Sequence, residues 1–177
     1  RDAVVGLLPE PLRAVTRRVG DEVFRVAHSP SKRELKGTEA FLDACADLDR
    51  EGIRIEPVLI EGQSFADSLR AKAKCDAAFD SFWLGMQCSG LEAAAMGLPV
   101  IAGDADQREG YQRMGHETPY TVANTPVELK DALRRLATES AYCTSEAARV
   151  HAFVADVHDE ARVALRDTAL TVPVDGD

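Results

Sequence analysis

A cluster of cations stands out in an otherwise acidic sequence. Lys32, Arg33 and Lys36 fall within five residues of one another. The segment that holds them lies between a short apolar stretch ending at His28 and a helical pattern beginning at Thr38. Cations between a strand and the start of a helix can bind a compact anion, because the helix dipole also favours negative charge there. These residue types and their spacing indicate a diphosphate grip, with Lys36 and Arg33 or Lys32 as point charges.

An ordinary surface loop explains the same cations. Ser31 and Glu34 have the spacing of a capping box, and a run of charged residues is commonly a solvated face. The segment matches neither a Walker A loop nor the Gly-x-Gly-x-x-Gly pattern, which argues against those two modes of nucleotide binding. Both interpretations stay open at this point.

A second candidate for chemistry follows a later apolar stretch, between Asp80 and Glu92. Free N–H groups at the start of the helix expected over 89–96 could cradle a phosphate, and Gly90 permits close approach. Glu92 could accept paired hydrogen bonds from ribose hydroxyls, and Asp80 could hold a sugar hydroxyl. The alternatives are a capping box between Ser89 and Glu92 and a simple turn aspartate at position 80.

The remaining polar residues are weaker indications of function. His28, at the end of a predicted strand, is a modest candidate for contacting a donor or an acceptor. Asp104 and Asp106 share a polar loop, and we expect no metal site there. The four cysteines are widely spaced without a Cys-x-x-Cys pattern, which favours neither zinc nor a disulfide framework and is typical of a reducing compartment.

Alternating apolar runs and helical patterns predict the elements that position these residues. Strands are expected over 21–28, 53–60, 77–80 and 100–103. Helices are expected over 38–52, from Ser64, over 89–96, and from Thr125 through further helices to about residue 170. This alternation is typical of an α/β fold, a Rossmann-like doubly wound parallel sheet with helices on both faces. Ligands of such sheets bind at the carboxyl ends of the strands, where both candidate loops lie.

Length and charge narrow the function classes. The 177 residues fit one domain, expected over 21–170, with a linker or edge segment over 1–20 and a frayed tail over 171–177. The net charge of −9 argues against a broad surface for nucleic acid or anionic membranes. No apolar run approaches the roughly 20 residues of a transmembrane helix.

Two segments carry a resemblance to a known family. The first, 28–39, reads His-Ser-Pro-Ser and then Lys-Gly-Thr-Glu, and the second, 90–102, reads Gly-Leu-Glu-Ala-Ala-Ala-Met-Gly-Leu-Pro-Val-Ile-Ala. Together with 153–163 they resemble the retaining GT-B glycosyltransferases of family 4, over about residues 22 to 165. The resemblance implies the C-terminal, nucleotide-sugar-binding half of a GT-B fold.

The resemblance also implies roles for individual residues. Lys36 and Arg33 would stabilise the diphosphate during transfer, and Glu92 would hold the ribose. The other positions expected to bind the donor are Lys32, Gly90, Leu91, Asp80 and His28. The donor would be a nucleoside-diphosphate sugar, with no cofactor and no metal. One departure is Leu84, which stands where the family commonly has a first glutamate; donor-sugar recognition by that carboxylate is then absent or falls to Asp80.

Several whole-protein expectations follow from the same resemblance. An N-terminal domain of the same protein would hold most of the acceptor site, so the chain would be a piece of a longer, cytoplasmic enzyme, peripheral to a membrane at most through that domain. Alone it would bind a nucleoside diphosphate but transfer sugar poorly or not at all. The rival interpretations are a sugar-nucleotide epimerase of the same architecture and a non-catalytic Rossmann-like interaction module.

Overall fold

The computed structural model describes residues 23–105 and 107–158, and these residues form one parallel sheet covered by helices. The sheet has five strands in the order β2-β1-β3-β4-β5, and every neighbouring pair is parallel. Its strands are β1 (Phe24–His28), β2 (Ile55–Leu59), β3 (Ala77–Phe79), β4 (Val100–Ala102) and β5 (Thr121–Val122). The central strands β3 and β4 are buried throughout, as expected for a parallel sheet with both faces covered.

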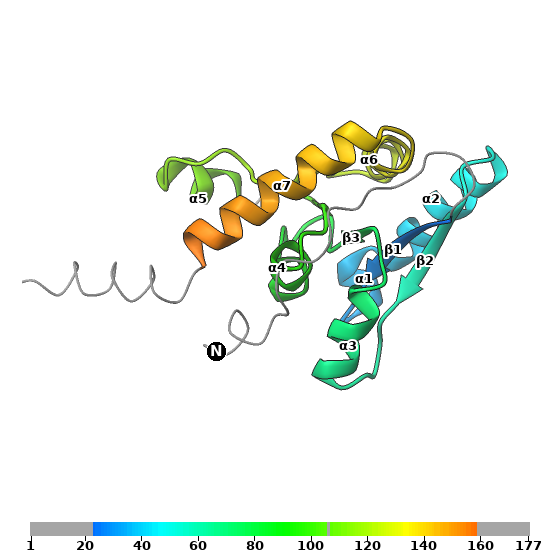
Figure 1. The fold of residues 1–177 in the computed structure, drawn as a ribbon. Coiled ribbons are helices and arrows are strands. Elements are labelled where there is room, and N and C mark those ends of the chain that lie inside the picture. The colour runs from blue at the N-terminus through cyan, green and yellow to red at the C-terminus, as the bar shows by residue number, and fades with distance from the viewer. Residues whose placement is uncertain (1–22, 106, 159–177) are drawn as a thin grey trace, which may run out of the picture.

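Helices cover both faces of this sheet (Figure 1). The helices are α1 (Arg33–Lys36), α2 (Thr38–Arg50), α3 (Phe65–Lys72), α4 (Cys88–Ala95), α5 (Arg108–Arg113), α6 (Pro126–Thr138) and α7 (Ser140–Val157). Helices α2 and α6 pack on one face, whereas α3, α4, α5 and α7 contribute to the core on the other. Helix α7 contacts both α4 and α6 and so joins the two layers. The predicted doubly wound α/β fold is confirmed.

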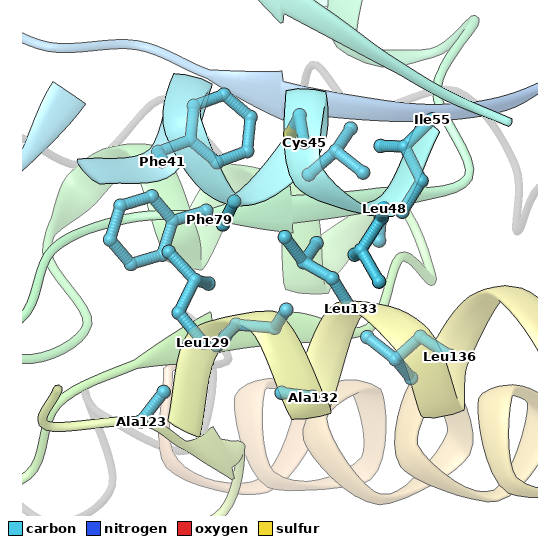
Figure 2. Close-up of a cluster of buried hydrophobic side chains, with 14 of the residues drawn as sticks. Phe41, Cys45, Leu48, Ile55, Phe79, Ala123, Leu129, Ala132, Leu133 and Leu136 are labelled. Atoms are coloured by element: carbon cyan, nitrogen blue, oxygen red, sulfur yellow. The ribbon is translucent and has the colours of Figure 1, made fainter. Parts of the chain in front are cut away.

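The first core cluster lies between the sheet and the pair α2 and α6. Figure 2 shows Phe41 and Leu48 of α2 facing Leu129 and Leu133 of α6, with Phe79 of β3 beside them. These five side chains are at most 1% exposed. Burying a side chain of this size contributes about 1.5–3 kcal/mol, so this cluster fixes α2, and with it the loop that precedes α2, on the sheet.

The second core cluster lies on the opposite face. Ala93 and Ala94 of α4 are fully buried there, together with Val150, Phe153 and Val154 of α7. The small alanine side chains allow α4 to lie close to the sheet. This packing fixes the position of α4, and with it the amino end of that helix.

Some local signals in the sequence predict the structure well. Ser64 caps α3 by accepting a hydrogen bond from the amide of Asp67 at 3.2 Å. Thr125 and Glu128 form the complete capping box expected at the start of α6. Both helix starts are confirmed.

Other local expectations are wrong. Lys32 is the N-cap of α1 and the side chain of Ser31 makes no capping bond, so the capping box between Ser31 and Glu34 does not form. Helix α4 begins at Cys88 with Gln87 as its N-cap, without a side-chain cap from Ser89. Helices α1 and α5 and strand β5 were not expected from the sequence. The expected segments 1–20 and 171–177 lie outside the described residues.

Candidate functional site

The carboxyl ends of β1 and β3 define a topological switch point in this sheet. The chain leaves β1 toward β2 on one side and later returns to place β3 on the other side of β1. His28 at the end of β1 is in register with Phe79 at the end of β3. The loops after these strands therefore diverge to opposite faces, and such crevices are where open α/β sheets bind ligands.

A buried ion pair bridges the two loops. Lys36 is the last residue of α1, and its Nζ lies 2.5 Å from Oδ1 of Asp80, which follows β3. The side chains are only 7% and 1% exposed, respectively. The structure thus brings together two predicted site residues that are 44 positions apart in the sequence.

Asp80 also caps helix α4. Its Oδ2 accepts hydrogen bonds from the amides of Gln87 at 2.6 Å and Gly90 at 3.0 Å. A Cβ at position 90 would lie 2.7 Å from this oxygen, so glycine is needed for the approach. A carboxylate at the amino end of a helix is favoured by the helix dipole. Asp80 is thus the cap of α4, and the alternative of a capping box between Ser89 and Glu92 does not form.

The first turn of α4 keeps two other amide donors. Leu91 donates its N–H to the carbonyl oxygen of Gln87 at 2.9 Å, so that amide is used inside the helix. The amides of Cys88 and Ser89, in contrast, donate to no other residue in the described part of the chain. Helix amino ends with unused N–H groups attract anions, so these two amides are the donors still available to a phosphate.

Glu92 forms a second buried ion pair. Its Oε2 is bonded to Nζ of Lys72, the last residue of α3, and the Lys72 side chain is 2% exposed. The Glu92 side chain is 13% exposed, and its Oε1 has no hydrogen-bond partner among the residues described. One carboxylate oxygen of Glu92 is therefore free to accept a further hydrogen bond. Lys72 was not among the residues that the sequence indicated, because its pairing with Glu92 depends on how α3 and α4 pack.

His28 is held inside the protein. Its Nδ1 lies 3.0 Å from the carbonyl oxygen of Phe79, and its Nε2 lies 2.8 Å from Oγ1 of Thr38. A carbonyl only accepts, so Nδ1–H donates to it and Nε2 of the neutral ring accepts from the Thr38 hydroxyl. Burial lowers the pKa of His28 below its ordinary value of 6.5, which favours the same neutral form. Both ring nitrogens are thus engaged before any ligand binds.

The other two predicted cations lie at the surface. Arg33 makes two hydrogen bonds to Glu61, at 3.0 and 2.6 Å, and a longer one to Glu39 at 3.4 Å. Hydrogen bonding from Arg33 lowers the pKa of Glu61. Lys32 is exposed, and its ammonium contacts no acceptor within the described ranges. Lys32 is therefore the most available of the three charges.

The buried side chain of Phe82 fixes the position of the loop that follows Asp80. Gly37 has a φ of +71°, and a Cβ there would lie 2.3 Å from the Phe82 ring. A Cβ on Gly103 would lie 1.5 Å from the Phe82 carbonyl oxygen. Two glycines from separate loops therefore make room for Phe82, whereas Trp83 and Leu84 on the same loop are 56% and 40% exposed. Leu84, where the family resemblance led us to expect a glutamate, is therefore a partly exposed apolar residue.

The carboxylate of Asp104 is engaged in hydrogen bonds to neighbouring residues. Its carboxylate accepts two hydrogen bonds from Arg108, at 2.8 and 2.9 Å, and further bonds from Thr118 and Asn124. Hydrogen bonding from Arg108 lowers the pKa of Asp104. The side chain thus joins α5 to the loop before α6. Asp106, the other aspartate of this loop, lies outside the described residues.

Three solved structures share this fold, and one of them is a domain of a group 1 glycosyltransferase. No family model matches the chain. TarM from S. aureus, solved with UDP, superposes with a TM-score of 0.65 at 9% identity, over 87% of this chain and 37% of that one. HepE from Anabaena, solved with UDP and glucose, gives 0.60 at 16% identity, over 85% and 49%. The C-terminal domain of the group 1 glycosyltransferase LpcC from Francisella tularensis gives 0.54 at 15% identity, over 76% and 86%.

These likenesses define the class of fold, a Rossmann-like α/β domain of the kind found in GT-B glycosyltransferases. The chain spans about half of HepE and a smaller share of TarM. Among curated proteins, a proline–tRNA ligase from Prochlorococcus marinus (strain AS9601) is 27% identical over 123 residues, which is 69% of this chain and 20% of that protein. None of the described helices is both long and apolar enough to cross a bilayer.

Proposed function

We propose that this chain is the donor-binding half of a glycosyltransferase, and that it binds a nucleoside-diphosphate sugar at the β1–β3 switch point. The observation that carries the proposal is the bond network from Lys36 through Asp80 to the amides of Gln87 and Gly90. This network ties the cation-bearing loop to the amino end of α4, so positive charge and amide donors share one place. UDP in the complexes of HepE and TarM supports the same ligand class.

Different residues of the site would bind different parts of the donor. Lys36 carries three N–H donors and gives one to Asp80, so its charge and remaining donors can act on a diphosphate. Exposed Lys32, Arg33 and the unused amides of α4 would add to this grip. When the glycosidic bond breaks, the leaving diphosphate gains negative charge, and preorganised donors stabilise it without a metal ion. Glu92 would hold the ribose through its unused oxygen.

The whole-protein function extends beyond this chain. An N-terminal domain of the same protein would hold the acceptor, as the likeness to the C-terminal domain of LpcC supports. We propose a retaining, family 4-like, cytoplasmic enzyme. Alone, the chain would bind the nucleoside diphosphate and transfer sugar poorly or not at all.

Binding of nucleotides to the chain tests the proposal. A thermal-shift screen with UDP, GDP, ADP and their sugars should raise the unfolding temperature for one base, because a ligand that binds only the folded state stabilises it. Calorimetry with that nucleotide should show that Glu92→Gln binds it about 10- to 100-fold more weakly, because a hydrogen bond to a charged group is lost.

A surface variant provides the control for this experiment. Glu117 is exposed, so Glu117→Gln makes the same chemical change away from the switch point and should leave the affinity unchanged. In the full-length enzyme, Lys36→Ala should lower turnover more than it lowers donor binding. The proposal is refuted if no nucleoside diphosphate binds, or if Glu92→Gln and Lys36→Ala leave both affinity and turnover unchanged.

A further inference from the structure

The ion pair between Lys72 and Glu92 joins helices α3 and α4, and its two residues are 20 positions apart in the sequence. Lys72 ends α3 and is 1% exposed as a residue, whereas Glu92 lies in the middle of α4. Both helices face the second core cluster, which contains Ala93 and against which Leu69 packs. Lys72 is thus a charged residue in largely apolar surroundings on both helices.

Stability alone does not account for this lysine. Removing two charges from water costs several kcal/mol per ion, and apolar residues of similar volume often replace a buried ion pair at no loss of stability. The neighbouring Lys74 is exposed, as a lysine usually is. The distinguishing feature of Lys72 is that its ammonium holds one oxygen of Glu92 and leaves the other without a partner in the described part of the structure.

We infer that Lys72 is a positioning residue, which holds the Glu92 carboxylate so that Oε1 accepts hydrogen bonds from the ribose hydroxyls of the donor. This inference rests on the proposed function. Lys72 fixes Oε2, and Oε1 keeps two lone pairs, enough for two vicinal hydroxyls. The pair therefore selects a ribonucleotide over a 2′-deoxyribonucleotide, although Lys72 itself touches no ligand.

The preorganisation of Glu92 determines how much nucleotide affinity should be lost when Lys72 is removed. A free glutamate side chain must be immobilised when it binds a ligand, whereas Glu92 is already held by Lys72. Immobilising one such side chain weakens binding by about 3- to 10-fold. Loss of Lys72 should cost this factor for a ribonucleotide and less for its 2′-deoxy form, which keeps only the 3′-hydroxyl as a partner for Glu92.

Calorimetric titration of the chain with UDP and with 2′-deoxy-UDP tests the inference; GDP or ADP and its 2′-deoxy form replace them if the screen above selects that base. The variants are Lys72→Met, Glu92→Gln, both together, Lys72→Arg and the exposed control Lys74→Met. We expect the wild type to prefer the ribonucleotide, and Lys72→Met to lose about 3- to 10-fold in affinity for it, with a smaller loss for the 2′-deoxy form. Lys72→Met should add nothing in the Glu92→Gln background, Lys72→Arg should restore part of the preference, and Lys74→Met should bind like the wild type.

The outcomes separate the two proposals. If the wild type binds no nucleoside diphosphate, the proposed function fails and this inference falls with it. If the wild type binds but shows no ribose preference, or if Lys72→Met keeps the full preference, only the inference is overturned. Equal losses for both nucleotides in Lys72→Met, or an unfolded Lys72→Met together with a Lys72→Arg variant that binds without ribose preference, would show a merely structural role and overturn it as well.

Discussion

The change Asp80→Asn removes the charge on which the switch point depends. Asp80 accepts three hydrogen bonds, from Lys36 at 2.5 Å and from the amides of Gln87 at 2.6 Å and Gly90 at 3.0 Å. Asparagine has a single acceptor oxygen, and its amide N–H groups would face either the ammonium or the backbone donors. At least one buried donor would then lose its acceptor.

The burial of this pair sets the magnitude. The two side chains are 7% and 1% exposed, so solvent cannot replace the lost partner. Removing one member of a buried ion pair destabilises a protein by about 3–5 kcal/mol. A domain of this size loses about 2–4 °C of unfolding temperature per kcal/mol, so Asp80→Asn should unfold about 6–20 °C below the wild type.

Urea unfolding followed by circular dichroism measures this loss, with the double variant Lys36→Met/Asp80→Asn as the critical comparison. Methionine at position 36 needs no counter-charge, so the double variant should be less destabilised than the sum of the single variants. Glu109→Gln is a matched control, because its ion pair with Arg113 is exposed, and it should leave the midpoint unchanged. Asp80→Asn within about 1 kcal/mol of the wild type, or additive single losses, would refute the reasoning.

Two further predictions concern stability. Gly37→Ala should destabilise the chain more than Gly52→Ala; both glycines have positive φ, but only a Cβ at position 37 would meet Phe82, and equal losses in urea unfolding would contradict this. Because burial lowers the pKa of His28 in the folded state, the unfolded state binds more protons, so the stability that the neutral ring contributes is complete above pH 6.5 and is lost as the pH falls below that value. The urea midpoint of His28→Gln should therefore depend less on pH between about 5 and 6.5 than that of the wild type, and equal slopes would refute the assignment.

The larger elements could be predicted from the sequence because their signals are local. The helical spacing from Phe41 to Leu48 and the capping box at Thr125 predict α2 and α6 directly. Strand β5 has only two residues, Thr121 and Val122, and so carries no periodic pattern. Helix α1 has only four residues, Arg33–Lys36, and is too short for helical periodicity to show.

The candidate site was less predictable, because its bonds cross long stretches of sequence. The sequence indicates Lys36, Asp80 and Glu92 as site residues, but it does not indicate that Lys36 pairs with Asp80 or that Lys72 pairs with Glu92. The pair of Lys72 and Glu92 depends on how α3 and α4 lie side by side, which neither helix encodes alone. The local pattern at Ser89 and Glu92 also suggested the wrong cap, because Asp80 supplies it from the end of β3.

The bridge from Lys36 through Asp80 to α4 has a mechanical consequence. It fastens the connection after β1 to the connection after β3, although these leave the sheet toward opposite layers. A displacement of either connection would strain the other, so the two should open together rather than separately. Exchange of the Gln87 and Gly90 amide hydrogens with solvent deuterium would thus report on events at Lys36, on the far side of the carboxylate.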